Sequence, residues 1–458
     1  MKYISTRGQV EPISFKDAIM MGMASDGGLL IPESFPSVAD QLEDWKNLSF
    51  QEIAFKVFSL YIDDIPSNDL KTLVEKSYST FDHDLVTPVA KLSKLGILEL
   101  FHGPTLAFKD VALQFLGNLF EYILNERNGQ LNILGATSGD TGSAAIQGVK
   151  GKDNINIFIM HPDGKTSPLQ ALQMTSVLEK NVFNIAVEGS FDDCQGIMKE
   201  TFADLDFKGK YNLGAVNSVN WARILAQTVY YFHAYNQVAE QGEKISFSVP
   251  TGNFGDIFAG YIAKSMGLPI DKLILATNEN DILARFFNSG VYERGNVNFT
   301  ISPAMDIQIA SNFERFLYFL VDKNPAKIRE AMEQFKSTGK VIIEDKYMAN
   351  NDCFVSAASG TERTLATIKK YWSEENYLLD PHTAVGVDVA ESLKLDSKVV
   401  CLSTAHPAKF PDAIQDATGE DLAKHPTLEA LKGAETRCHK ASSDINEIQA
   451  YLADNALS

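Results

Sequence analysis

The chain has 458 residues, of which 45% are hydrophobic, and its formal net charge is -18 at pH 7. A chain of this length should divide into two or three domains, because single hydrophobic cores stop growing at roughly 250 to 300 residues. So acidic a sequence, with no cluster of basic residues, argues against nucleic acid and anionic membrane surfaces as partners.

Neither the N-terminus nor the cysteines indicate secretion. The first eight residues lack the apolar core of a secretion signal, and no run approaches the roughly 18 apolar residues that a membrane span needs. The four cysteines are widely scattered and show no Cys-x-x-Cys spacing, which fits free thiols in a reducing compartment better than disulfides or zinc. We therefore expect a cytoplasmic protein with no bound metal.

The first part of the chain has the pattern of a mainly helical unit. Ser14 precedes a helical pattern over residues 15–23 and can cap it. Two further helical patterns cover residues 50–61 and 68–78. We therefore expect a helical N-terminal domain over residues 1–90.

Beyond about residue 95, short β-rich runs alternate with helical patterns, which is typical of parallel α/β sheets. The clearest runs each end in a glycine-rich or polar turn and cover residues 131–134, 155–160, 245–249 and 399–402. Ligands bind where such strands end. We expect a large α/β domain over residues 91–130 and 216–458, and a smaller α/β lobe over 131–215 that is the candidate for movement. Within the large domain, the tail from residue 419 has a polar helical pattern and is expected to form an outer layer.

Lys109 follows a Gly103-Pro104 turn and stands at the entry to an apolar stretch. An ammonium is costly to desolvate, whereas an amine in a tight apolar environment can condense with an aldehyde as a Schiff base. Pyridoxal phosphate is therefore the first cofactor to test. The alternative is an ordinary turn followed by an ordinary cation at a helix start.

Two glycine-rich loops follow predicted strands. Residues 252–256 open a helix, so their backbone amides can turn toward an anion at its N-terminus. In residues 135–142 the glycine spacing matches neither the dinucleotide fingerprint nor the phosphate loop with its lysine, and the hydroxyls of Thr137, Ser138 and Thr141 suit a carboxylate. The alternatives are a plain glycine turn in the first loop and helix capping in the second.

Two further segments carry polar groups that could bind a ligand. Arg223 follows a cluster of amide and hydroxyl side chains that begins at Asn217, and its guanidinium fork can bind two phosphate oxygens at once. Thr404 ends an apolar strand with a hydroxyl that could reach a heterocycle nitrogen. The alternatives are a solvated helix start at the first segment and a capped or surface histidine, His406, at the second.

In this order, these segments resemble the threonine synthase family, pyridoxal-phosphate enzymes of the tryptophan-synthase-β-like class with fold type II. The likeness also covers Tyr3–Gly8 and Asp26–Pro32 and so extends over most of the chain. It implies an α/β fold with parallel-sheet lobes and a mainly helical N-terminal domain. The implied reaction converts O-phospho-L-homoserine and water to L-threonine and phosphate, the last step of threonine biosynthesis.

The resemblance also implies a role for each matching position. Lys109 would be the catalytic residue and bind the cofactor covalently, while Thr404 would face the pyridine nitrogen. The loop that would hold the cofactor phosphate consists of Gly252, Asn253, Phe254, Gly255 and Asp256. The residues that would bind substrate are Thr137, Ser138, Thr141, Asn217, Ser218 and Arg223.

One position departs from the family pattern, and three other functions compete. Many members have Ser-Gly-Asn-Thr where this chain has aspartate at position 140, and a carboxylate cannot donate the same hydrogen bond to the cofactor. The nearest alternative is a sister pyridoxal enzyme, such as a serine/threonine dehydratase or a β-replacement sulfhydrylase, which would not need Arg223. The other two are a nucleotide-dependent oxidoreductase and a non-catalytic binding protein. The sequence gives no indication of oligomeric state.

Overall fold

The computed structural model describes residues 1–137, 139–240, 242–349 and 351–457. These residues form two compact units, each of which gathers segments that are distant in the sequence. The first unit consists of Met1–Val74, Phe81–His102 and Ser218–Ala423. The second consists of Glu75–Thr80, Gly103–Asn217 and Lys424–Ser458.

In the first unit, the described strands form a mixed sheet in the order β13-β10-β9-β14-β4-β3. All neighbours are parallel except β3, which is antiparallel to β4. The strands of this sheet are β3 (Val89–Lys91), β4 (Gly96–Glu99), β9 (Ile245–Pro250), β10 (Ile270–Thr277), β13 (Phe354–Ala358) and β14 (Val399–Ser403). Because β9 and β14 are parallel neighbours, the loops that follow them begin at the same edge of the sheet.

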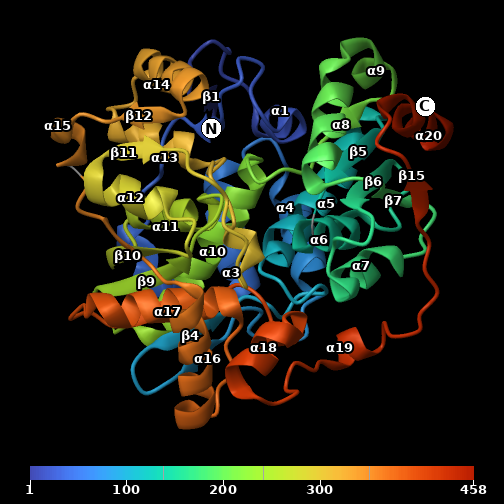
Figure 1. Cartoon of the computed structure of the whole chain (residues 1–458). Helices are drawn as coiled ribbons and strands as arrows, with labels where there is room; N and C mark the ends of the chain where they lie inside the picture. The colour runs from blue at the N-terminus through green and yellow to red at the C-terminus, as the bar shows by residue number, and fades with distance from the viewer. Residues whose placement is uncertain (138, 241, 350, 458) are drawn as a thin grey trace. The chain divides into compact units, whose positions relative to one another are not determined.

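Helices and two antiparallel strand pairs complete the first unit (Figure 1). The pairs are β1 (Tyr3–Ser5) with β2 (Leu30–Pro32), and β11 (Val291–Glu293) with β12 (Lys340–Ile342). The N-terminal helices are α1 (Phe15–Met21), α2 (Leu42–Trp45), α3 (Phe50–Tyr61) and α4 (Ser67–Tyr78), the last of which runs into the second unit. The others are α10 (Trp221–Val238), α11 (Gly255–Ser265), α12 (Ile282–Ser289), α13 (Phe313–Leu320), α14 (Pro325–Thr338), α15 (Asp345–Met348), α16 (Thr361–Glu375), α17 (Pro381–Leu393) and α18 (Pro411–Thr418). Short 3₁₀ turns cover Ala39–Gln41, Pro303–Met305 and Pro407–Lys409.

Local capping explains where several of these helices begin. Ser14 accepts a hydrogen bond from the backbone amide of Asp17, as the sequence predicts. Ser49 and Glu52 form a reciprocal capping box at the start of α3. Asn324 caps α14, with proline in the first helical position.

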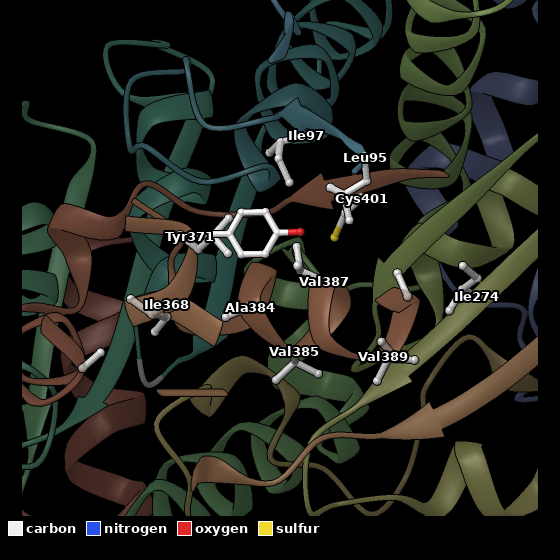
Figure 2. Packing of buried hydrophobic residues seen from close by; sticks show 14 of the residues in the cluster. Leu95, Ile97, Ile274, Ile368, Tyr371, Ala384, Val385, Val387, Val389 and Cys401 are labelled. Atoms are coloured by element: carbon white, nitrogen blue, oxygen red, sulfur yellow. The ribbon is translucent and has the colours of Figure 1, made fainter. Parts of the chain in front are cut away.

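The core of the first unit includes the contact between α17 and the sheet. Figure 2 shows Val385, Val387 and Val389 of α17 among side chains of neighbouring strands, including Ile274 and Cys401. All five are fully buried, and each of the three valines and the isoleucine contributes on the order of 1.5 to 3 kcal/mol of transfer free energy. Burial also raises the pKa of the Cys401 thiol above its usual range, which makes this cysteine an apolar core residue.

The second unit is built on a parallel sheet with strand order β15-β7-β6-β5-β8. Its strands are β5 (Leu131–Ala136), β6 (Ile155–Pro162), β7 (Val182–Val187), β8 (Leu213–Gly214) and β15 (His439–Ala441). Its helices are α5 (Lys109–Arg127), α6 (Asp140–Val149), α7 (Pro168–Thr175), α8 (Phe191–Ala203), α9 (Leu205–Lys210), α19 (Pro426–Glu429) and α20 (Ile445–Asn455). In its core, Cys194 of α8 and Ile448 of α20 pack with Phe158 and Ile185 of the sheet.

Helices α5 and α6 approach each other very closely. A Cβ atom added at Gly117 would lie 2.0 Å from the carbonyl oxygen of Gly148. A Cβ atom added at Gly148 would lie 2.5 Å from the carbonyl oxygen of Leu113. Glycine is therefore required at both positions, because any side chain would push the backbones apart.

The boundaries of the two units differ from the domain division expected from the sequence. The segment Met1–Val74 groups with the first unit, although a separate domain over residues 1–90 was expected. The segment Lys424–Ser458 groups with the second unit because β15 pairs with β7 and α20 joins its core. Within this tail, for which the sequence predicted a helical pattern, α20 is a helix but His439–Ala441 is a strand. Movement of the smaller lobe stays a prediction.

None of the described helices combines the length and the apolar character that a membrane-spanning segment needs.

Candidate active site

Lys109 is the first residue of α5, and the turn before it is fixed by the next residue, Asp110. The fully buried carboxylate of Asp110 accepts hydrogen bonds of 2.8 Å from both the backbone amide and the hydroxyl of Thr105. A Cβ atom at Gly103 would lie 2.5 Å from that of Asp110, so only glycine leaves room for this arrangement. The turn therefore holds the lysine backbone rigidly.

The Lys109 amine lies beside a carboxylate. Its Nζ is 3.6 Å from Oδ2 of Asp140, and the two side chains are only 12% and 7% exposed. The amide of Gln170 donates a 3.0 Å hydrogen bond to Oδ1 of Asp140 and so orients the carboxylate. The sequence predicted apolar surroundings for this amine. The structure instead pairs it with the aspartate to which the resemblance assigned no role.

In the loop that precedes α6, the hydroxyl of Thr137 is hydrogen-bonded to the backbone of the same loop and of the first turn of the helix. Oγ1 of Thr137 accepts hydrogen bonds from the backbone amides of Gly139 (3.1 Å) and Gly142 (3.2 Å). This favours the capping interpretation for Thr137, whose binding role stays a prediction. Thr141 is half-buried in the first turn of α6, and Ser138 lies outside the described residues.

In the first unit, the loop after β9 forms the N-terminus of α11. Phe254 has a left-handed backbone conformation (φ 65°), and its ring packs among aromatic side chains that include Phe287 and Phe313. A Cβ atom at Gly252 would lie 2.6 Å from the carbonyl oxygen of Ala304. The loop is thus packed against aromatic side chains at Phe254 and against the backbone of Ala304 at Gly252. This packing fixes the N-terminus of α11, whose positive dipole end favours an anion.

The side chain of Asp256 is hydrogen-bonded to two tyrosines and is not free to bind an anion. Its carboxylate accepts hydrogen bonds from the hydroxyls of Tyr230 and Tyr231, and burial raises its pKa to about 7. These bonds attach the loop to α10. Any contribution of Asp256 to cofactor binding would therefore come through the backbone, and it stays a prediction.

Arg223 is the most informative side chain of the first unit. It lies in the first turn of α10 and is only 4% exposed, and burial lowers its pKa to about 10, so it remains charged at neutral pH. Its Nε and Nη1 have no hydrogen-bond partner among the described residues. An uncompensated buried charge costs several kcal/mol, which an anionic ligand would relieve. The solvated helix start that the sequence left open is wrong for this residue.

Ser218 stands at the beginning of the segment that leads to Arg223. Its Oγ lies 2.6 Å from Oγ of Ser311, and its carbonyl oxygen accepts a 3.1 Å hydrogen bond from the amide of Asn312. Asn217, the residue before Ser218, is half-buried and ends a segment of the second unit. Ser311 and Asn312 were not predicted as site residues; a polar pair before an apolar helix is a recognisable capping signal, but the side chain of Asn312 does not cap α13.

Thr404 directly follows β14 and is 7% exposed. Because β14 and β9 are parallel neighbours, Thr404 and the loop that begins at Thr251 lie at the same edge of the sheet. The prediction that Thr404 and the loop at Gly252 bind the same cofactor is therefore consistent with the strand order. Where the structure describes the chain, no three His, Cys, Asp or Glu side chains gather as metal ligands would.

Each unit, taken by itself, carries groups of the kinds that bind a phosphorylated aldehyde cofactor. The second unit holds a primary amine at a helix start, and the first unit offers an amide-lined helix N-terminus, a buried guanidinium and a hydroxyl after β14. This fold and these groups define the pyridoxal-phosphate-dependent enzymes of fold type II. The family model of pyridoxal-phosphate-dependent enzymes matches residues 81–347, and models of the N terminus and the C-terminal part of threonine synthase match residues 2–78 and 383–452.

Comparison with known proteins gives the particular family. Threonine synthase of Pseudomonas aeruginosa is 46% identical over 99% of this chain and 98% of its own length, and that of Saccharomyces cerevisiae is 49% identical over 91% and 88%. The crystal structure of pyridoxal-phosphate-bound threonine synthase from Brucella melitensis has a TM-score of 0.97 at 44% identity and covers both chains completely. The chain belongs to the threonine synthase family. Maize serine racemase, at 14% identity and a TM-score of 0.51, shares the fold alone.

Membership confirms several expectations drawn from the sequence. The fold class, the cofactor pyridoxal phosphate and the activity of a carbon-oxygen lyase are those of this family. The oxidoreductase and the non-catalytic binding protein are set aside by the same findings.

Proposed function

We propose the residues through which this chain carries out the threonine synthase reaction, which converts O-phospho-L-homoserine and water to L-threonine and phosphate. Lys109 would bind the cofactor covalently, and the loop from Gly252 to Asp256 would hold the cofactor phosphate with its backbone amides. Thr404 would face the pyridine nitrogen. The single observation that carries the substrate assignment is the buried guanidinium of Arg223, whose Nε and Nη1 have no partner among the described residues.

The bound cofactor supplies an electron sink that makes the α and β protons of an amino acid removable. Once the substrate amine has taken its place, Lys109 would act as the general base that moves those protons, a role worth about 10²- to 10⁴-fold in rate. Asp140, which lies 3.6 Å from the lysine amine, would stabilise the ammonium that forms when Lys109 accepts a proton. This gives the aspartate a role that an asparagine could not fill.

Arg223 would stabilise the phosphate that leaves from Cγ of the substrate. A guanidinium can donate two parallel hydrogen bonds to a phosphate, and the bonds strengthen as the leaving group gains charge. The hydroxyl of Ser218 and the amide of Asn217 would complete that anion site, while Ser138 and Thr141 would bind the substrate carboxylate. Water would then add at Cβ.

A hydroxyl at position 404, unlike a carboxylate, need not protonate the ring nitrogen. This would keep the electron sink modest and restrain unwanted transamination. We further propose a cytoplasmic location, a small molecule as the only substrate partner and no binding to nucleic acid, in keeping with the net charge of -18.

The test compares Lys109→Ala with Lys180→Ala, an exposed lysine of the same unit. The wild type and the Lys180 variant should be yellow, and borohydride reduction should attach the cofactor to them irreversibly. Both should release phosphate from O-phospho-L-homoserine with threonine as the co-product. Lys109→Ala should show none of these properties. A reducible lysine adduct that persists in Lys109→Ala refutes the assignment, and a wild type that releases no phosphate refutes the proposed reaction.

A further inference from the structure

The residues that lead into α13 take no part in the roles above, yet they touch both anion-binding segments of the first unit. Asn312 is fully buried, and its backbone amide donates a 3.0 Å hydrogen bond to the carbonyl oxygen of Asn253 in the loop before α11. Its side-chain Nδ2 donates to that same oxygen and to the carbonyl oxygen of Ser218, each at 3.1 Å. One amide group therefore joins two segments that are predicted to bind different phosphates.

Two residues near Asn312, Gly255 and Ser311, support this arrangement. A Cβ atom at Gly255 would lie 3.2 Å from Nδ2 of Asn312, so glycine keeps the amide close to the loop. The hydroxyl of Ser311 lies 2.6 Å from Oγ of Ser218, in the segment that leads to Arg223. In the hydrogen bonds of the described residues, Asn312 thus contacts both segments, whereas Ser311 contacts the Ser218 segment.

The orientation of the Asn312 amide is set by Arg315, which is fully buried in the first turn of α13. Its Nη1 donates to Oδ1 of Asn312, which turns Nδ2 toward the two carbonyl oxygens. Its Nε and Nη2 donate to the carbonyl oxygen of Leu30 at 3.2 and 2.9 Å, and Nη2 also donates to that of Val219. Unlike Arg223, this guanidinium has all three of its nitrogens engaged, Nε and Nη2 by backbone carbonyls and Nη1 by the side-chain oxygen of Asn312.

The N-terminal segments support the same helix start. The hydroxyl of Thr6 donates a 2.6 Å hydrogen bond to the carboxylate of Glu314, and Arg7 forms an ion pair with it at 2.9 Å. Leu30, whose carbonyl accepts from Arg315, lies in β2, which pairs with β1. The two N-terminal motifs noted in the sequence, Tyr3–Gly8 and Asp26–Pro32, therefore anchor α13 and, through Arg315, the amide of Asn312.

We propose that Asn312 is a positioning residue that fixes the cofactor-phosphate loop and the Arg223 segment in one arrangement. This deepens the proposed function, on which it rests for the identity of the two anions. A hydrogen bond that holds a binding loop acts on affinity when the loop must otherwise be ordered by the ligand. Loss of Asn312 should therefore weaken the binding of both anions together.

The experiment compares Asn312→Ala, Ser311→Ala and a matched control, Asn324→Ala, which removes the cap of α14. Three quantities are measured for each: the dissociation constant of pyridoxal phosphate, KM and kcat for O-phospho-L-homoserine, and Tm. Asn312→Ala should raise both the cofactor dissociation constant and KM by about fivefold, since each segment loses one side-chain hydrogen bond worth about 1 kcal/mol. Ser311→Ala should raise KM by several-fold and leave the cofactor dissociation constant unchanged. The control should lower Tm alone.

A purely structural role makes a different prediction. If Asn312→Ala lowers Tm as the control does, with both affinities within about twofold of the wild type, the proposal is overturned. If that variant does not fold, Asn312→Asp decides, because aspartate keeps the shape of the side chain but has no Nδ2 to donate, and both affinities within about twofold of the wild type then overturn the proposal. A wild type that binds the cofactor but releases no phosphate would instead count against the proposed reaction, and the cofactor dissociation constants would still test Asn312.

Discussion

Replacing Arg223 with methionine should make the protein more stable and far less active. The guanidinium is 4% exposed, and two of its nitrogens have no partner among the described residues. Methionine retains the unbranched stem and removes the charge. Substitution of buried charges by apolar side chains of similar volume has been neutral or stabilising by about 1 to 4 kcal/mol, and Arg223 lacks a compensating partner among those residues. We therefore expect the ligand-free protein to gain stability of this size.

The change in melting temperature follows from the length of the chain. Unfolding entropy is about 2.1 cal/mol/K per residue, so a chain of 458 residues shifts its Tm by about 1 °C for each kcal/mol. The expected gain is about 1 to 4 °C. Loss of two charge-assisted hydrogen bonds to phosphate, each worth about 1.5 to 3 kcal/mol, should lower kcat/KM by about 10²- to 10⁴-fold.

Two controls separate this explanation from a general effect of removing arginine. Arg285 is 39% exposed and paired with Asp281, so Arg285→Met should change Tm by less than about 1 °C, because exposed pairs contribute little. Inorganic phosphate should raise the Tm of the wild type loaded with pyridoxal phosphate and leave that of the equally loaded Arg223→Met unchanged, because the cofactor already occupies the other phosphate site. The reasoning is refuted if Arg223→Met melts at a lower temperature than the wild type and keeps its kcat/KM.

Two further predictions concern the loop after β9 and the packing of α5 on α6. Because burial raises the pKa of Asp256 to about 7, its contribution to stability is full below about pH 4 and is lost as the pH rises through about 7. Asp256→Asn cannot titrate, so its Tm relative to the wild type should rise between about pH 5 and pH 8, and a constant difference would contradict this. Gly117→Ala should destabilise the protein by about 1 to 3 kcal/mol in denaturant unfolding, because its Cβ would lie 2.0 Å from Gly148 O. Gly196→Ala in α8, with no atom within 4 Å, should be neutral or stabilising, and equal losses in both variants would refute the packing argument.

The sequence determined the features that depend on near neighbours. The cap at Ser14 and the strand starts at Leu131 and Val399 are where the sequence predicted them. Their hydrogen bonds and side-chain periodicity involve residues only a few positions apart, so local pattern suffices. The glycine loops likewise lie between a strand and a helix, although Gly135 belongs to β5 and Gly142 to α6, and the motifs within them led to the family.

Tertiary packing determines which groups meet across long distances in the chain. Lys109 and Asp140 are brought together by the packing of α5 and α6, and Asn312 reaches Ser218 across 94 positions. The short strand at His439–Ala441 has no strong pattern of its own and exists because the edge of β7 is available to pair with it. Pairing of this kind depends on where the rest of the fold leaves an open edge, which no local pattern records.

The surroundings of two buried arginines, Arg223 and Arg315, also depend on the tertiary structure. The sequence offered two interpretations of Arg223, a phosphate ligand or a solvated helix start, and it gave no prediction for Arg315. The fold buries both, but it places backbone carbonyls around Arg315 and leaves two nitrogens of Arg223 without a partner among the described residues. The physical reason is that the cost of a buried charge depends on the acceptors that surround it, and these come from segments that only folding brings close.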